Sequence, residues 1–122
     1  MMTTSEFDEL LRKLAIGWTN REYSSVAERF AEDVFYSDPW NYTIRNRDAL
    51  FAFFADDEGK PQSCTFHNHL FDEARQVGAA EYTYEGTFRY HGTVWIELRN
   101  DLTVSWREYQ HRSDKDWKEI WK

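Results

Sequence analysis

The chain has 122 residues and a formal net charge of −7, and it is rich in aromatic side chains, with 6 Trp, 7 Tyr and 9 Phe. A surface this acidic repels phosphate backbones and anionic lipid head groups, which excludes nucleic-acid and membrane partners. The length predicts one domain over residues 1–122. The surplus of aromatic residues predicts a lined cavity, a subunit interface, or both.

The cysteine content and the N-terminus indicate the compartment. Cys64 is the only cysteine, so an intrachain disulfide is excluded and a reducing setting is expected. Residues 1–6 have neither the basic region nor the apolar run of a signal peptide. No stretch of the sequence approaches transmembrane length. The sequence therefore predicts a soluble, cytoplasmic protein.

The N-terminal third of the chain predicts two helices. The first is a long amphipathic helix over about residues 5–19, because its apolar residues recur three or four positions apart. Thr3 and Glu6 predict a capping box in front of it. A shorter helix is expected from about Tyr23 to Phe30. The residues of the first helix that are expected to face the core are Phe7, Leu10, Leu11, Leu14 and Trp18.

The rest of the chain predicts a short strand, a third helix and then mostly strands. Residues 34–36 are β-rich and Pro39 ends them. Asn46 is expected to cap a helix that carries Leu50, Phe53 and Phe54 on one face. Strands are expected over about 64–75, 79–90, 93–99 and 102–111, with turns at Gly78, Gly92 and Asn100-Asp101.

These elements predict an α+β domain. Strands so close in sequence are expected to pair as an antiparallel meander, with three helices from the N-terminal half packed on one face. A strongly curved sheet of this kind leaves a conical cavity that the aromatic residues would line. The closing residues Trp117, Ile120 and Trp121 predict either a last helical turn or a docking tail.

Two acids, Asp38 and Glu108, are the main candidates for chemistry. Each lies among large aromatic residues, where desolvation would raise the pKa of the carboxyl group toward the range used in proton transfer. The alternative for Asp38 is that it caps a turn before Pro39. The alternative for Glu108 is an ion pair with Arg107, Arg99 or a cross-strand partner.

Strand alternation favours a cavity position for Glu108. Residues two apart in a strand face the same side, so Glu108 shares its face with Trp106, Val104 and Leu102. This apolar set indicates that Glu108 points into the cavity. The aromatic residues that are predicted to contact a ligand with it are Trp18, Tyr36, Trp40, Tyr84 and Trp106.

His67 and His69 form a His-x-His pair on a predicted strand. The alternation of strand side chains places both on one face, and which face that is stays open. No third ligand lies at a fixed spacing, so no metal is predicted. The two imidazoles are expected to contact the ligand or to assist proton transfer.

Three segments in this order give the chain a family resemblance. They are Phe30–Pro39, Ile44–Leu50 and Trp95–Tyr109. Together they resemble the nuclear transport factor 2-like superfamily, and in particular its SnoaL-like branch. The resemblance implies a cone-shaped, cystatin-like fold, no cofactor, and a homodimer formed through the outer face of the sheet.

Comparison with members of that superfamily narrows the chemistry. Asp38 resembles the base of ketosteroid isomerases, but their oxyanion donors would fall at Leu14 and near Val94, which have no donor side chain. Tyr36, Asp38 and Glu108 resemble parts of the limonene-epoxide hydrolase site, while residues 84–87 lack its arginine and second aspartate. Glu108-Tyr109 resembles the acid/base aspartate and following aromatic residue of SnoaL-type cyclases.

The sequence thus predicts a protein that binds a small apolar or aromatic molecule. The expected chemistry is acid/base isomerisation, cyclisation or hydration, with Asp38 as base and Glu108 as acid, and with Tyr36 and Tyr84 orienting a carbonyl or hydroxyl. One alternative is a dimeric binding or accessory protein without chemistry. A dimerisation module is a third hypothesis.

Overall fold

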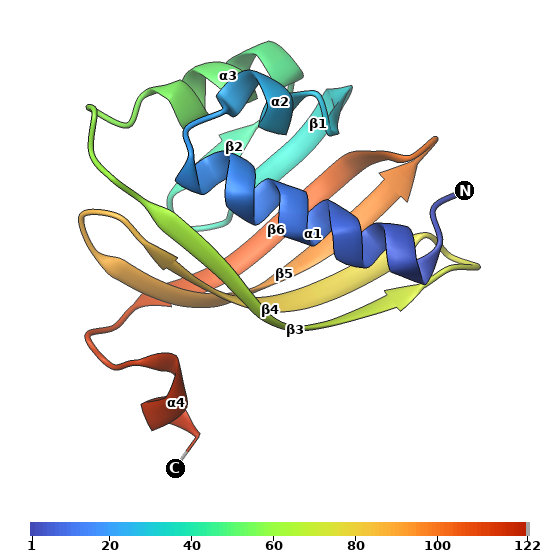
Figure 1. Cartoon of the computed structure of the whole chain (residues 1–122). Coiled ribbons are helices and arrows are strands. Elements are labelled where there is room, and N and C mark those ends of the chain that lie inside the picture. Colours follow the sequence, from blue (N-terminus) through green and yellow to red (C-terminus); the bar gives the residue numbers. More distant parts are fainter. Residues whose placement is uncertain (122) are drawn as a thin grey trace.

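The computed structural model describes residues 1–121 as one curved sheet with three helices on its concave side (Figure 1). In chain order the elements are α1 (Thr4–Thr19), α2 (Tyr23–Ala27), β1 (Phe30–Asp38), β2 (Tyr42–Ile44), α3 (Arg47–Ala55), β3 (Ser63–Asp72), β4 (Val77–Glu85), β5 (Arg89–Arg99), β6 (Leu102–Arg112) and α4 (Trp117–Ile120). No helix in this part of the chain has the length and apolar character needed to cross a membrane.

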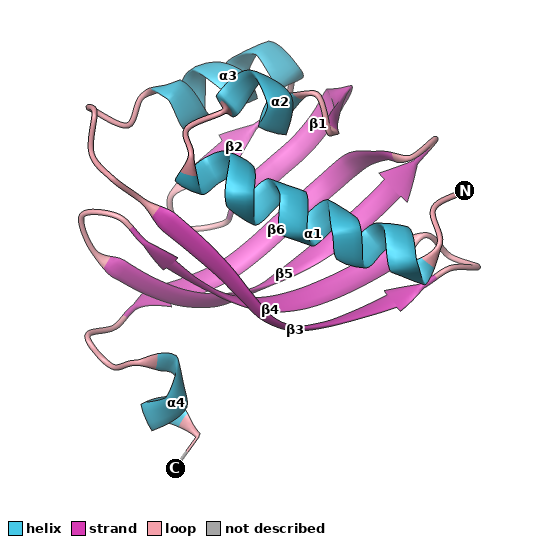
Figure 2. Ribbon diagram, in the orientation of Figure 1, coloured by secondary structure: helices cyan, strands magenta, loops and turns pink. Residues whose placement is uncertain are grey.

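The sheet is mixed, which corrects the expectation of a purely antiparallel one. Its strand order is β2-β1-β6-β5-β4-β3, and β1 runs parallel to β6 while the other neighbours are antiparallel. The meander of β3 to β6 was predicted from short connections. The pairing of β1 with β6 joins segments about 70 residues apart, for which sequence proximity gives no signal. Figure 2 shows the two strands side by side.

The helices begin at the predicted caps. The hydroxyl of Thr3 accepts a hydrogen bond from the backbone of Glu6, whose side chain accepts one from the backbone of Thr3, which completes the capping box. Asn46 accepts from the backbone of Ala49 at 2.8 Å and starts α3. All five predicted core residues of α1 are buried. The apolar face of this helix packs across β3 and closes one side of the sheet's concave face.

Two glycines that were predicted to form turns lie inside strands instead. A Cβ at Gly78 would lie 2.4 Å from the Phe7 ring, and a Cβ at Gly92 would lie 2.8 Å from the Tyr82 ring. These glycines are required because an aromatic ring approaches the backbone closely. The predicted Asn100-Asp101 turn is confirmed, and both residues have positive φ, as a tight hairpin demands.

Candidate functional site

A cavity of about 490 Å³ lies between the concave sheet face and the helices. This volume falls within the range of small-molecule sites, about 300–1,000 Å³. Its walls are mainly aromatic, with a few acids and amides. The lining residues are Trp18, Tyr36, Asn41, Tyr42, Phe53, Phe54, Asp56, Asp57, Gln62, Cys64, Phe66, Tyr82, Tyr84, Tyr90, Trp106, Glu108 and Gln110.

Glu108 is the buried acid of this cavity. It lies on β6 opposite Val94 and is only 6% exposed. The indole nitrogen of Trp106 donates to its Oε1 at 2.7 Å, and the hydroxyl of Tyr42 donates to its Oε2. Burial raises the pKa of the Glu108 carboxyl, and the hydrogen bonds from Tyr42, Trp106 and Tyr36 oppose this only in part.

No cation neutralises Glu108 among residues 1–121. The two arginines considered as partners point away and pair elsewhere: Arg107 lies 3.0 Å from Glu97, and Arg99 lies 3.0 Å from Asp33. The ion-pair alternative for Glu108 is therefore wrong. Burial of a carboxyl group without a counter-charge is costly, and ionisable groups in such surroundings cluster at functional sites.

The donors around Glu108 determine where its proton can reside. An indole nitrogen can only donate, so Oε1 must remain an acceptor toward Trp106. A proton on Glu108 therefore sits on Oε2, the oxygen that Tyr42 also contacts. Burial also raises the pKa values of Tyr36 and Tyr42, so both stay neutral phenols at physiological pH. Oε2 is the atom through which this site can exchange a proton.

Asp38 occupies the end of β1 and is not part of the cavity wall. It is 1% exposed, and both of its oxygens are used within the β1–β2 turn. Oδ1 accepts from the backbone nitrogen of Trp40 at 3.1 Å, and Oδ2 accepts from the side-chain nitrogen of Asn41 at 2.9 Å. These contacts are those of the turn-capping alternative. The structure therefore brings only one of the two candidate acids into the cavity.

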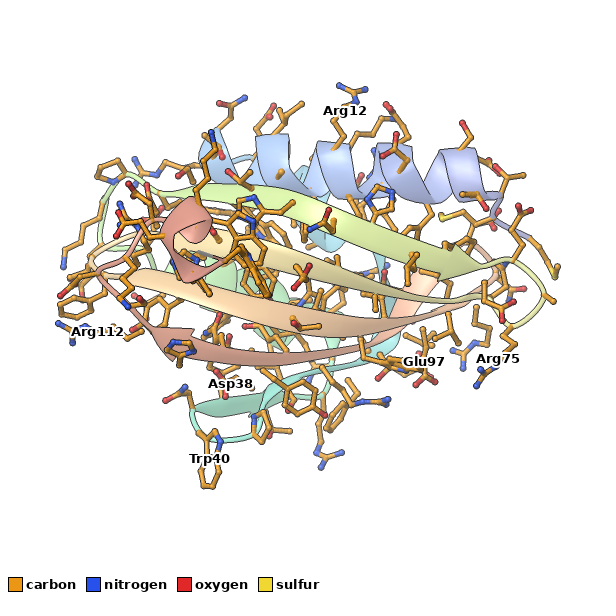
Figure 3. The ribbon with its side chains drawn as sticks, turned by 90° about the horizontal axis from the view of Figure 1, so that it is seen from below. Arg12, Asp38, Trp40, Arg75, Glu97 and Arg112 are labelled. Carbon is orange, nitrogen blue, oxygen red and sulfur yellow. The ribbon has the colours of Figure 1, made fainter. Side chains whose placement is uncertain are left out.

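The predicted aromatic contacts fall into two groups. Trp18, Tyr36, Tyr84 and Trp106 line the cavity as expected. Trp40 does not, because Pro39 ends the strand and leaves Trp40 at the tip of the β1–β2 turn, 91% exposed. Figure 3 shows its side chain projecting away from the sheet. Trp40 therefore cannot contact a molecule in this cavity.

The two histidines lie on opposite faces of β3, and neither lines the cavity. A bulge shifts the pairing between Phe66 and Asn68, so the simple alternation that placed both on one face is broken. His67 points outward, where it contacts Thr83 at 2.6 Å and stacks on Trp117 with ring centroids 4.2 Å apart. His69 points inward, under α1, with Nε2 3.3 Å from Asp8. Their predicted ligand contacts are therefore wrong.

A second bulge changes the argument for Glu108 but not its outcome. The β5–β6 pairing shifts between Glu97 and Leu98, so Leu102 and Val104 do not continue the face of Trp106 and Glu108. Leu102 and Val104 are only half-buried, while Thr103 is fully buried. The predicted common face holds for Trp106 and Glu108 and continues to Gln110, which also lines the cavity.

Several cavity residues were not predicted from the sequence. Tyr42 comes from β2, a strand of three residues that is too short to show a pattern. Gln62 precedes β3; its amide donates to the Tyr23 hydroxyl at 2.6 Å and accepts from the Tyr84 hydroxyl at 2.5 Å. Cys64 also faces the cavity, but burial raises its pKa to about 12, so its thiol is not a nucleophile. For Tyr82 a signal was available, because it lies two residues from Tyr84 on β4 and therefore faces the same side of the strand.

No metal centre is formed by the described side chains: no three His, Cys, Asp or Glu residues in 1–121 come together at a distance suited to one ion.

Comparisons with known proteins identify the fold. No family model and no curated protein matches the sequence. Solved structures do match. A nuclear transport factor 2-like protein of unknown function from Burkholderia xenovorans LB400 has a TM-score of 0.76 at 17% identity, covering 94% of this chain and 91% of that one. The chain therefore has the nuclear transport factor 2-like fold, which confirms the predicted fold.

Two further neighbours have named properties. An LEH-like epoxide hydrolase from M. tuberculosis has a TM-score of 0.72 at 13% identity, over 84% of this chain and 80% of that one. A protein with a ketosteroid isomerase-like fold from Catenulispora acidiphila DSM 44928, in complex with trimethylamine, has a TM-score of 0.72 at 18% identity. The match covers 83% of this chain and 84% of the neighbour's chain.

Proposed function

We propose that the cavity binds a small molecule with a large apolar or aromatic surface and that Glu108 exchanges a proton with it. The observation that carries this proposal is a buried carboxyl group at the wall of an aromatic cavity, with no cationic partner in the described part of the chain. Desolvation makes such a carboxylate a stronger base than one in water. Isomerisation, cyclisation and hydration all require this kind of proton transfer.

The polar groups of the cavity have separate roles in this proposal. Tyr42 and Trp106 hold the carboxyl of Glu108 in place, and Oε2 is the atom that takes or gives the proton. The Tyr84 hydroxyl donates to Gln62, so its proton is already used within the wall. Asp38 has no role in the reaction, because its oxygens serve the turn.

Binding without chemistry is the second candidate function. It is favoured by two positions where ketosteroid isomerases are expected to keep oxyanion donors, because Leu14 and Val94 stand there and both are fully buried and apolar. The neighbour in complex with trimethylamine supports the idea that this fold holds small organic molecules.

A nitrobenzisoxazole provides a test that requires no knowledge of the natural substrate. A carboxylate that removes its ring C–H proton causes the N–O bond to break, and the product is a coloured cyanophenolate. We expect turnover above the buffer rate, abolished in Glu108→Gln and retained in Glu97→Gln, which alters an acid on the outer face. Fluorescence of Trp18 and Trp106 would report binding of the probe. If the probe binds without turnover, only the binding function remains. If the probe does not bind, both proposed functions are refuted.

We also propose that the chain forms a homodimer through the outer face of its sheet. Trp95 on β5 and Tyr109 on β6 face outward between inward-facing neighbours and are exposed. Exposed aromatic residues on a sheet face are typical of subunit interfaces. Light scattering coupled to gel filtration should give twice the mass of the chain, and Tyr109→Lys should reduce it to that of a monomer. A monomeric wild-type protein would refute this proposal.

A further inference from the structure

The charged side chains of the cavity wall are all acidic. Of the 17 lining residues within the described chain, ten are aromatic and three are acidic, while none is Lys, Arg or His. Asp57 is already paired with Arg21 at 2.8 Å. Glu108 at the inner wall and Asp56 at the rim have no such partner among residues 1–121. A cavity of one sign focuses its potential, so it attracts cations and repels anions.

The aromatic groups around Glu108 add to this preference. The rings of Tyr36 and Trp106 lie parallel, with centroids 5.8 Å apart, and those of Tyr42 and Phe53 lie 4.7 Å apart. Faces of Trp, Tyr and Phe attract ammonium groups through the ring quadrupole. The phenol of Tyr42 and the indole of Trp106 each donate a hydrogen bond to the carboxyl group, which increases the electron density of their rings. Aromatic side chains and a carboxyl group thus line the same cavity.

We infer that the ligand of this cavity is an organic cation: a small apolar or aromatic molecule that carries an ammonium group, with Glu108 as its counter-charge. This rests on the proposed function in one respect, namely that the cavity is the ligand site. A neutral ligand leaves the buried carboxyl uncompensated, and an anion is repelled by it. A cationic ligand keeps Glu108 ionised, so in any proton transfer with such a ligand Glu108 acts first as the base.

A pair of isosteric probes tests the inference. Phenyltrimethylammonium and tert-butylbenzene have the same shape. They differ at one atom, which is a positively charged nitrogen in the first and a neutral carbon in the second. Their dissociation constants are measured by quenching of the fluorescence of Trp18 and Trp106. We expect the cation to bind at least tenfold more tightly, a difference of about 1.4 kcal/mol. Equal affinity, or tighter binding of tert-butylbenzene, would overturn the inference. This comparison uses the wild-type protein alone.

Variants and pH locate the source of the preference. Glu108→Gln should weaken binding of the cation about tenfold and leave tert-butylbenzene within twofold, whereas Glu97→Gln should change neither. The cation does not titrate, so a loss of its affinity at acidic pH in the wild-type protein alone would report protonation of Glu108. A tenfold cation preference that persists in Glu108→Gln would contradict the assignment of Glu108 as counter-charge.

The outcomes separate this inference from the proposed function. If tert-butylbenzene binds and the ammonium probe does not, the cavity remains a ligand site and only the inferred charge is wrong. If neither probe binds at concentrations up to the solubility of tert-butylbenzene, both the ligand site and its charge preference are refuted.

Discussion

Replacing Tyr42 with Phe tests whether the carboxyl of Glu108 is ionised inside the cavity. The variant keeps the ring, which packs on Phe53, and removes only the hydroxyl that donates to Oε2. A hydrogen bond to a charged group contributes about 1.5–3 kcal/mol, and one between neutral groups about 0.5–1.5 kcal/mol. We therefore expect Tyr42→Phe to lower the free energy of unfolding by about 1.5–3 kcal/mol near neutral pH.

The pH dependence gives this prediction its specificity. Burial raises the pKa of Glu108 above its ordinary value of 4.5, so the folded state takes up the proton before the unfolded state does as pH falls. The ionised form, with its larger dependence on Tyr42, is therefore populated at the higher pH. The cost of Tyr42→Phe should shrink as the pH falls through the folded-state pKa toward 4.5. Removal of the donor should itself raise that pKa further, because the hydrogen bond from Tyr42 lowers it.

Urea unfolding across this pH range measures the cost, and carboxyl-carbon NMR of Glu108 measures the pKa. Tyr84→Phe is the matched control, since its hydroxyl lies in the same cavity wall but donates to the neutral amide of Gln62. Its cost should be about 0.5–1.5 kcal/mol and independent of pH. A cost of Tyr42→Phe that does not change with pH, or a Glu108 pKa that falls in this variant, would refute the reasoning.

Three further substitutions test other parts of the structure. Asp38→Ala should destabilise the fold by about 1–3 kcal/mol and leave turnover of the nitrobenzisoxazole per folded molecule unchanged; a loss of turnover would restore Asp38 as a reacting group. Gly92→Ala should cost about 1–3 kcal/mol in urea unfolding, because its Cβ would strike the Tyr82 ring, and an unchanged midpoint would show that the ring moves freely. Trp117→Ala should return the pKa of His67 toward 6.5 in NMR titration, because desolvation lowers that pKa under the Trp117 ring; no change would mean that other groups cause the desolvation.

Local patterns predicted local structure in this chain. The Thr3 capping box, the Asn46 cap and the Asn100-Asp101 turn each depend on a few neighbouring residues, and all three are confirmed. The inward direction of Glu108 was predicted from a face shared with Trp106, Val104 and Leu102. The bulge removes Val104 and Leu102 from that face, and the direction holds because Trp106 and Glu108 lie on the same side of it. Features of this range are specified by the chemistry of adjacent residues, whatever the rest of the chain does.

Features that depend on distant partners were missed, because local patterns contain no information on how remote strands pair. The bulge at His67 depends on how β3 pairs with β4, and its effect is to send His67 and His69 to opposite faces. Tyr42 reaches Glu108 because β2 pairs with β1 and β1 with β6, a relation that spans 66 residues. The sequence therefore predicted the buried acid of the cavity but not the phenol that donates to its Oε2 atom.

The register of β6 decides which charge the cavity contains. Arg107 and Glu108 are adjacent, and alternation sends the arginine outward to Glu97 and the glutamate inward. A slip of one residue would exchange them and place a guanidinium in the aromatic cavity. The parallel pairing of Tyr36 with Trp106 and the antiparallel pairing of Val94 with Glu108 both oppose that slip, since Tyr36, Trp106 and Val94 are buried. The same packing that buries the aromatic core thus keeps Glu108 inside, without a counter-charge from residues 1–121, and in our proposal a cationic ligand supplies that charge.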